Sequence, residues 1–394
     1  MKRTAKFLVS AVVLGLSVIF ASCNSGNVKG KVLGDYVIEL PVVTEIDYDL
    51  GLKMDKEHCG KGFGCSAVGK VLENGDMVIG RSLDFFYSER PCYVIRTNVP
   101  GYLKTVGLAH NPMSGTVFAE AKKNGISKDE LAGLLFFTTD ILNEKGFYIE
   151  GNMRASQPAD TGIKQSTATN PDAELTMSVV ALIRYIGERA STVDEALELA
   201  KSVNIHGLMA ETFTWGAGFF MADKSGHHGV LELVDNKLIW NEMQDIQTNF
   251  YLNSEYKDKA TLGSGVGRYK TLSEGYADVK DEKGMQDLMA KVKYAQLFTP
   301  DTSEFDVRSE FTSEEVVDGH MLTMEYVLAE ENRDKMMQKI REFAEVEGKK
   351  SLEQHRKEGT EWYSSYQSII NCNKGTLRAI FYEDPALTFD FTVE

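Results

Sequence analysis

Residues 65–86 read CSAVGKVLENGDMVIGRSLDFF, and this stretch decides how the folded body of the chain begins. Residues 66–72 and 77–86 are rich in apolar and β-branched residues. The residues between them include Asn74-Gly75, which is the strongest short signal for a β-hairpin. The stretch therefore predicts two antiparallel strands. With Asn74 and Gly75 as the two loop residues, Cys65 is expected directly across from Asp84.

Further along the chain, the same alternation of strand and turn signals recurs, with amphipathic helical patterns in between. The predicted hairpins are 230–234 with 238–240 and 366–372 with 376–382. The predicted helices are 175–188, 192–203 (opened by a capping box from Thr192 to Glu195), 284–297 and a longer, interrupted stretch from 312 to about 356. Strands at both ends with helices between them predict an α+β fold with a single domain over residues 65–394.

The composition is that of a folded protein. Of the 394 residues, 43% are hydrophobic and 26% are charged, which excludes a disordered chain, a collagen and a coiled coil. The net charge of -15 argues against a protein that binds nucleic acid, because such a protein needs positive charge. After the first two dozen residues no apolar run is long enough for a membrane span.

Residues 1–23 have the layout of a secretory signal. Three cations among the first six residues precede an apolar stretch from 7 to 20, and the small residues Ala21 and Ser22 come directly before Cys23. That ending resembles a bacterial lipoprotein signal, in which the cysteine carries the lipid. We expect export to the periplasm or tethering to a membrane face through Cys23, with a buried N-terminal helix as the alternative.

Residues 24–64 are polar and become Gly-rich toward their end, which predicts a linker or pro-segment with a protease-accessible end. The 5 cysteines have no C-x-x-C spacing and the 7 histidines have no H-E-x-x-H spacing. No metal site, cofactor site or disulfide framework is therefore predicted. Whether Cys92 and Cys372 pair with each other stays open at this point.

Cys65 allows two interpretations from the residues alone. A thiol across from the carboxylate of Asp84 is one arrangement for catalysis. Arg81 lies three residues before Asp84, on the opposite face of an ideal strand, so a bulge or a strong twist would be needed to bring both side chains to Cys65. In the alternative, Cys65 is a buried core cysteine and Arg81 forms a surface ion pair with Asp84.

A set of short motifs continues from this hairpin through the rest of the chain. In order, they are Cys65-Ser66-Ala67-Val68, Gly80-Arg81-Ser82-Leu83-Asp84-Phe85, Asn143-Glu144-Lys145-Gly146, Asp223-x-x-Gly226 with Glu232, Thr248-Asn249-Phe250, Gly265-x-x-Arg268-Tyr269 and the hairpin within 362–382. This series resembles the choloylglycine hydrolase family of N-terminal-nucleophile amidases, which includes conjugated bile acid hydrolases and penicillin V acylases. The resemblance implies a four-layer αββα sandwich and a mature chain that begins with its nucleophilic cysteine.

The resemblance also assigns roles to six residues. Cleavage before Cys65 would give that residue both a thiol nucleophile and a free α-amine that serves as its base. Asp84 would orient the amine, and Arg81 would lower the pKa of the thiol. The remaining three would stabilise developing charge: Asn249 and Asn152 at the oxyanion, and Arg268 beside the nucleophile.

The expected activity is the hydrolysis of a small-molecule acyl amide without a cofactor. Glycine- or taurine-conjugated bile acids are the first expected substrates, and penicillin V, other N-acyl amides and acyl homoserine lactones are the alternatives, because one nucleophile serves all of them. The resemblance also implies a homo-oligomer. A rival hypothesis from another class is a non-catalytic surface lipoprotein that keeps its leader and binds an amphipathic ligand.

Overall fold

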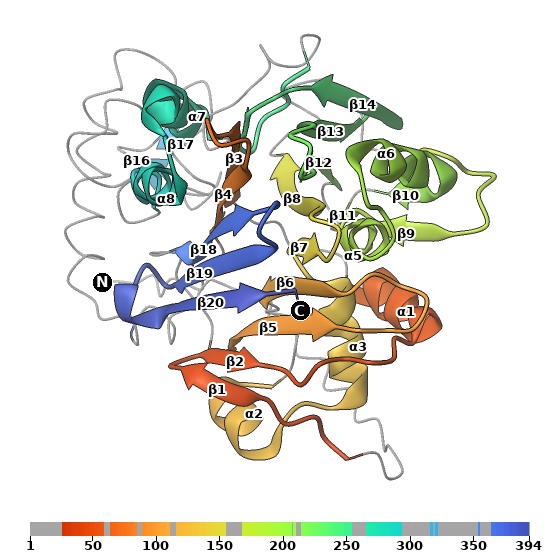
Figure 1. The fold of residues 1–394 in the computed structure, drawn as a ribbon. Coiled ribbons are helices and arrows are strands. Elements are labelled where there is room, and N and C mark those ends of the chain that lie inside the picture. The colour runs from red at the N-terminus through yellow and green to blue at the C-terminus, as the bar shows by residue number, and fades with distance from the viewer. Residues whose placement is uncertain are drawn as a thin grey trace, which may run out of the picture.

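The structure is a computed structural model, and it describes residues 26–58, 64–84, 89–110, 116–154, 168–206, 208–209, 214–253, 265–293, 316–317, 320–321, 354 and 364–393. In this part of the chain two large β-sheets are accompanied by seven α-helices, so the predicted α+β class is confirmed (Figure 1). None of the described helices is long and apolar enough to cross a membrane.

The larger sheet has ten strands, which are antiparallel except where β2 pairs in parallel with β5. Its order is β1 (Lys31–Gly34), β2 (Val37–Glu39), β5 (Cys92–Thr97), β6 (Thr105–His110), β7 (Asp140–Asn143), β8 (Tyr148–Arg154), β12 (Thr214–Ala222), β13 (His228–Val234) and β14 (Lys237–Glu242), with β11 (Leu208–Met209) paired to β12.

The smaller sheet has six strands and carries the hairpin that begins at Cys65. Its order is β15 (Ile246–Gln247), β3 (Gly64–Val71), β4 (Met77–Asp84), β18 (Ser364–Asn371), β19 (Thr376–Phe381) and β20 (Thr388–Thr392). The chain's first and last described strands thus belong to different sheets. Two further pairs are β9 (Thr176–Ser178) with β10 (Asn204–His206) and β16 (Val316–Val317) with β17 (His320–Met321).

Helices lie against both sheets (Figure 1). They are α1 (Tyr48–His58), α2 (Phe118–Asn124), α3 (Lys128–Phe136), α5 (Ala181–Gly187), α6 (Val193–Ser202), α7 (Val266–Gly275) and α8 (Glu282–Ala290). On the smaller sheet α8 packs so closely that a Cβ on Gly80 would lie 2.5 Å from Met289. On the larger sheet Ile183 of α5 approaches Gly151 in the same way, at 2.8 Å.

The two sheets also approach each other directly. A Cβ on Gly69 of β3 would lie 2.4 Å from the ring of Phe220 on β12, so only glycine fits at that point. Apolar side chains fill most of this space, and both Phe220 and Ala67 are completely buried. At the Cys65 end the space between the sheets is instead filled with buried charged side chains, among them Arg81 and Glu150.

The three predicted hairpins are confirmed as β3/β4, β13/β14 and β18/β19, but the register of the first is wrong by one residue. Gly64 lies across from Asp84, and Cys65 lies across from Leu83. The reason is the loop: Leu72 N donates to Asp76 O at 2.9 Å, which leaves three loop residues instead of two. Gly75 takes the left-handed conformation, with φ of 87°, that such a loop requires.

The predicted helices are confirmed in part. α6 forms as expected, and the Thr192 side chain accepts a hydrogen bond from Glu195 N. The expected helix 175–188 begins instead with strand β9, and its helical part is α5. The helix expected at 284–297 corresponds to α8, whose last residue is Ala290. Most of the stretch from 312 to 356 lies outside the described residues, and its described part includes the strands β16 and β17, where a helix was expected.

The segment before Cys65 is not a bare linker. Residues 31–39 form β1 and β2 at one edge of the larger sheet, and α1 follows at Tyr48–His58. Apolar side chains of β2 are buried, including Val37 and Ile38. The linker interpretation of residues 24–64 is therefore corrected, whereas a folded pro-segment stays compatible with these strands and this helix.

Candidate active site

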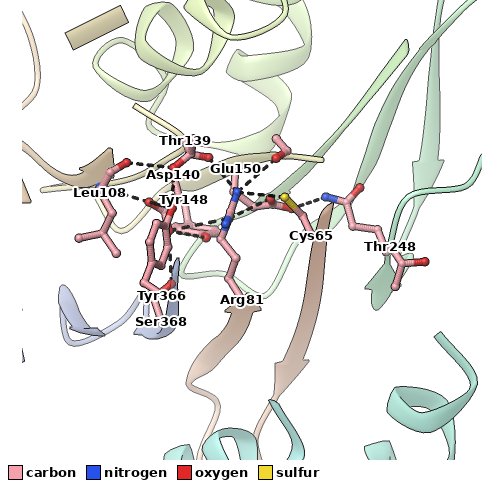
Figure 2. Close-up of polar contacts among 12 residues, drawn as sticks. Cys65, Arg81, Leu108, Thr139, Asp140, Tyr148, Glu150, Thr248, Tyr366 and Ser368 are labelled. Atoms are coloured by element: carbon pink, nitrogen blue, oxygen red, sulfur yellow. Dashed lines mark hydrogen bonds and ion pairs between the residues drawn. The ribbon is translucent and has the colours of Figure 1, made fainter. Parts of the chain in front are cut away.

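Cys65 stands at the start of β3, where the backbone enters the smaller sheet, and its side chain is completely buried. Arg81 follows on the adjacent strand β4, paired with Ala67, and is completely buried as well. The Arg81 guanidinium turns toward the cysteine, so that Nη2 lies 3.8 Å from Cys65 Sγ (Figure 2). A thiol and a guanidinium thus meet inside the protein.

Carboxylate and carbonyl groups of the larger sheet hold Arg81 in this position. Its Nε donates to Glu150 Oε2 at 3.0 Å, and its Nη2 donates to Gly151 O at 3.2 Å and to Thr139 O at 3.4 Å. On the other side the guanidinium lies over the ring of Tyr366, 5.5 Å from its centroid. The alternative of a surface ion pair with Asp84 is therefore wrong, because Arg81 is buried and pairs with Glu150.

The backbone of Cys65 is held by two other predicted residues. Cys65 N donates to Asn249 Oδ1 at 3.0 Å, while Arg268 Nη1 donates to Cys65 O at 2.6 Å. The two side chains also bind each other, through Arg268 Nη2 and Asn249 Oδ1 at 2.7 Å. Asn249 follows β15, which pairs with β3, and Arg268 lies in the first turn of α7. Residues far apart in sequence thus converge on the backbone of one residue.

Asp84 lies at the end of β4, close to a β-bulge in the neighbouring strand. The pairing of β18 with β4 shifts between Ser364 and Tyr366, so a bulge does occur here, although it lies on β18. Asp84 Oδ1 accepts from Ser364 Oγ at 2.6 Å and from Ser82 Oγ at 3.1 Å. Its Oδ2 lies 3.9 Å from Arg268 Nη1. Arg268 therefore links the carboxylate of Asp84 to the backbone of Cys65.

Asn152 lies on β8 and is buried, at 1% exposure. In the amide orientation that satisfies its neighbours, its nitrogen donates to Glu150 Oε2 at 2.8 Å and to Gly151 O at 3.2 Å. Asn152 thus touches the carboxylate that holds Arg81. The structure brings all six predicted residues into one buried network, in which Asn152 is joined through Glu150.

Two residues of β8 that support this network, Glu150 and Arg154, were not predicted from the sequence. Glu150, Asn152 and Arg154 alternate along the strand, so they share the face turned toward the smaller sheet. Arg154 donates to Gln247 Oε1 at 2.9 Å and to Glu232 Oε1 at 3.2 Å, and Gln247 in turn donates to Glu150. The signal that could have revealed them is the run of polar or charged residues at every second position of a β-strand pattern, with Glu150, Asn152 and Arg154 in turn.

Burial dominates the protonation of this site. Burial raises the pKa of the Cys65 thiol to about 12, and this effect outweighs the opposite effect of the nearby Arg81 charge. Burial also raises the pKa of Glu150 to about 7, although Arg81 and the hydrogen bond from Gln247 favour its ionised form. The lower thiol pKa expected beside Arg81 is therefore not reached in this uncut chain, and the thiol is protonated at neutral pH.

Nucleophilic chemistry at Cys65 consequently needs a group that removes the proton from the thiol.

Among the described residues no cluster of three or more histidine, cysteine or carboxylate side chains could hold a metal ion. Cys92 and Cys372 are not joined to each other by a disulfide, which answers the question that the sequence left open.

No protein-family profile and no curated protein sequence matches the chain. Among solved structures, a penicillin V acylase from Agrobacterium tumefaciens is similar over 83% of this chain and 86% of its own, with 14% identity and a TM-score of 0.40. Two variants of conjugated bile acid hydrolase from Clostridium perfringens are similar over 83% of this chain and 92% of theirs, with 13% and 12% identity and TM-scores of 0.39 and 0.43.

These proteins carry the two activities of the family that the sequence motifs resemble. Identities and TM-scores of this size do not assign the chain to that family. The function is therefore inferred from the residues of the site.

Proposed function

We propose that this chain is a cysteine amidase that hydrolyses linear amide C–N bonds through an acyl-enzyme on Cys65. One observation carries the proposal: three predicted side chains each hold a different atom of Cys65. Arg81 approaches Sγ, Asn249 accepts from N, and Arg268 donates to O. The backbone N–H and C=O of any buried cysteine need partners. A structural core cysteine needs no guanidinium at its sulfur or at its carbonyl, whereas a nucleophile must be held in one orientation.

The proposed base is the α-amine that Cys65 acquires when the peptide bond before it is hydrolysed. In the uncut chain Cys65 N is an amide that donates to Asn249 Oδ1 and cannot take up a proton. A free α-amine has an ordinary pKa of about 8, which suits a base at neutral pH. Because burial holds the thiol pKa near 12, the uncut chain has too little thiolate to react. Cleavage is therefore the activating step.

The reaction then follows from these positions. The amine takes the proton of Sγ, and the sulfur attacks the amide carbonyl of the substrate to form a tetrahedral intermediate. The intermediate collapses when the ammonium returns the proton to the leaving nitrogen, which departs as an amine and leaves a thioester on Cys65. Water, deprotonated by the same α-amine, then attacks the thioester carbonyl. The C–S bond breaks, the carboxylic acid is released, and the ammonium returns its proton to Cys65 Sγ, which restores the thiol and the free amine.

The remaining residues act on charge. Arg81 Nη1 is buried and makes no hydrogen bond to the described residues, so one N–H group of this guanidinium remains to face the substrate or the intermediate. We assign the oxyanion to Asn249 with Asn152, the orientation of the amine to Asp84, and the charge beside the nucleophile to Arg268. Losing one oxyanion donor typically lowers the rate about a hundredfold or more.

The substrate order comes from the resemblance of the motifs. We propose glycine- and taurine-conjugated bile acids first, then penicillin V, other N-acyl amides and acyl homoserine lactones. The charges of the site do not separate these, because Arg81 is paired with Glu150 and Arg268 lies 3.9 Å from Asp84. The acidic chain, with a net charge of -15, gives no attraction for anionic conjugates.

We also propose the finer features that accompany this function. The two sheets and their helices would form the four-layer αββα sandwich, with α8 against one sheet and α5 against the other. Residues 65–394 would be the amidase domain, and residues 24–64 its pro-segment. Export by residues 1–23, which lie outside the described part, would place the protein in the periplasm or tether it to a membrane through Cys23.

Amine release from four substrates tests the function: taurocholate, glycocholate, penicillin V and an acyl homoserine lactone. We expect cleavage of at least one by the processed protein, and a large loss of cleavage in Cys65→Ser. Full activity in Cys65→Ala would show that Cys65 is not the nucleophile. If none of the four is cleaved and the protein binds one of them unchanged, the rival ligand-binding function takes precedence.

A further inference from the structure

Residues 26–58 precede the proposed cut, yet they are built into the domain that follows it. β2 pairs in parallel with β5, where Val37 lies across from Cys92 and Glu39 across from Val94. The edge of the larger sheet in Figure 1 thus consists of strands from the segment that cleavage would separate. This pairing is made across the sheet and does not need the peptide bond between Gly64 and Cys65.

Backbone hydrogen bonds join the segment to the rest of the chain along its length. The bonds outside the β2–β5 ladder are spread over residues 28–43 of the segment. They are Val28 N to Ile126 O at 2.7 Å and Ile126 N to Val28 O at 2.9 Å, Cys92 N to Tyr36 O at 2.8 Å, Leu40 N to Val94 O at 3.0 Å, Val43 N to Arg96 O at 2.8 Å, and Asn98 N to Val43 O at 2.8 Å. Release of the segment would break all of them.

Apolar burial acts in the same direction. Val37 is completely buried, and Ile38 and Leu40 are each only 2% exposed. They belong to the same hydrophobic cluster as Tyr93 of β5. If the segment left, these side chains would enter water and the apolar face of β5 would be uncovered, which is unfavourable in proportion to the area exposed.

α1 adds a polar anchor on a different element. Asp55 is 5% exposed, and its Oδ2 accepts from Ser178 N at 2.9 Å while its other oxygen accepts from Ser178 Oγ. The helix also lies so close to α3 that a Cβ on Gly51 would be 2.0 Å from the ring of Phe136. The guanidinium of Arg189 lies 4.7 Å from the ring of Tyr48. Contacts of this density are those of a permanent interface.

We propose that residues 26–58 stay bound after the cut and form the second chain of a two-chain enzyme. The cut itself rests on the proposed function: water hydrolyses the bond between Gly64 and Cys65, which leaves a carboxylate on the segment and an amine on Cys65. The occupant of the β5 edge is thus this chain's own segment. A lipid on Cys23 would then tether the catalytic chain to the membrane through the retained segment, without a covalent bond.

The first test uses the full chain with an affinity tag after Glu394, purified at neutral pH. Denaturing mass spectrometry gives the masses of the chains, and native mass spectrometry gives the mass of the particle. We expect two chains under denaturing conditions and, under native conditions, a particle whose mass is their sum or a whole multiple of it. A folded, active particle that contains only the chain beginning at Cys65 would overturn the proposal.

A second test does not depend on self-processing. In Cys65→Ala, residues 59–63 are replaced by the recognition sequence of a site-specific protease, and the purified protein is cut. Retention of the segment on the tagged chain through gel filtration supports the proposal, even if the wild-type chain proves to be uncut and the proposed function fails. Loss of the segment from a catalytic chain that stays folded refutes it, whatever the activity.

Two matched variants of the same segment locate the interface. Ile38→Asp places a charge at a side chain that is 2% exposed, whereas Val42→Asp places it at one that is 46% exposed. After the engineered cut, we expect the Ile38→Asp segment to dissociate at least ten times faster than the Val42→Asp segment. Equal dissociation of the two would contradict the proposed interface. Where Ile38→Asp does not fold before the cut, Asp55→Asn takes its place in the same comparison.

Discussion

Glu150 provides a quantitative test of the buried network, because its carboxyl is expected to titrate near neutral pH. Burial raises its pKa from 4.5 to about 7. The folded state therefore disfavours ionised Glu150 more than the unfolded state does. The stability that Glu150 contributes is fully present below pH 4.5 and is lost as the pH rises through 7. At about 1.4 kcal/mol per pKa unit, the loss is about 3 kcal/mol.

Glu150→Gln keeps the shape of the side chain and removes the proton that titrates. The measurement is urea unfolding followed by far-UV circular dichroism at several values between pH 4 and pH 9. We expect the free energy of unfolding of the wild type, relative to the variant, to fall by about 3 kcal/mol over this range. The pH dependence of the difference is the test, because its value at one pH also contains the ion pair with Arg81.

Glu198→Gln is the matched control, since the Glu198 side chain is 76% exposed and pairs with Lys201 across one turn of α6. Its difference from the wild type should stay within about 0.5 kcal/mol at every pH. A difference for Glu150→Gln that is equally constant with pH would refute the conclusion that Glu150 is desolvated in the folded protein.

Three further predictions concern the surroundings of Cys65. Asn249→Ala should lower kcat about a hundredfold while circular dichroism shows an unchanged fold, and activity within a factor of about two of wild type would contradict its role. In uncut protein, alkylation of Cys65 by iodoacetamide should be very slow at pH 7.5, because burial raises the pKa of the thiol to about 12, and its rate should rise about tenfold per pH unit. Peptide mass spectrometry measures the alkylated fraction, and fast labelling at pH 7.5 would contradict the raised pKa. Gly218→Ala should lower the free energy of unfolding in urea by about 1–3 kcal/mol, because the new Cβ would lie 1.8 Å from Arg154 Nη2. An unchanged free energy of unfolding would show that the Arg154 side chain can adopt another conformation without cost.

The hairpins could be predicted from the sequence because their turn residues act locally, but their register could not. Asn74-Gly75 correctly located the turn of β3 and β4. The two-residue turn assumed for it needs positive φ at both residues, whereas only Gly75 has it. The one extra loop residue moved Cys65 from Asp84 to Leu83. A step of one residue in register is invisible to a motif and decides which side chains face each other.

Long-range contacts account for the rest of what the sequence did not predict. Residues 175–188 have a helical pattern, but Asn204, Ile205 and His206 recruit their first residues into a parallel strand pair. The polar composition of residues 24–64 suggested a linker. However, β2 within this segment pairs with β5, whose residues follow Cys65 in the sequence. Glu150 is likewise meaningful only because folding places it opposite Arg81.

Five of the six candidate site residues lie in the quoted motifs, and Asn152 came from the family resemblance. The structure shows why the motifs are spread over the chain. Cys65 and Arg81 come from one hairpin, Asn249 from the residue after the edge strand β15, and Arg268 from the helix that follows. Each element contributes one contact to the same cysteine. Spacing alone could not have shown this convergence, because these elements meet only after β15, β3 and β4 have paired in the smaller sheet and α7 has packed against it.

The most direct measurement of the central claim is the intact mass, under denaturing conditions, of the protein expressed with its full leader in a bacterium that exports it. We predict a species whose N-terminal residue is Cys65, since only that species has a free α-amine beside the buried thiol to act as its base. An active preparation in which every chain still carries a peptide bond before Cys65 would contradict the account.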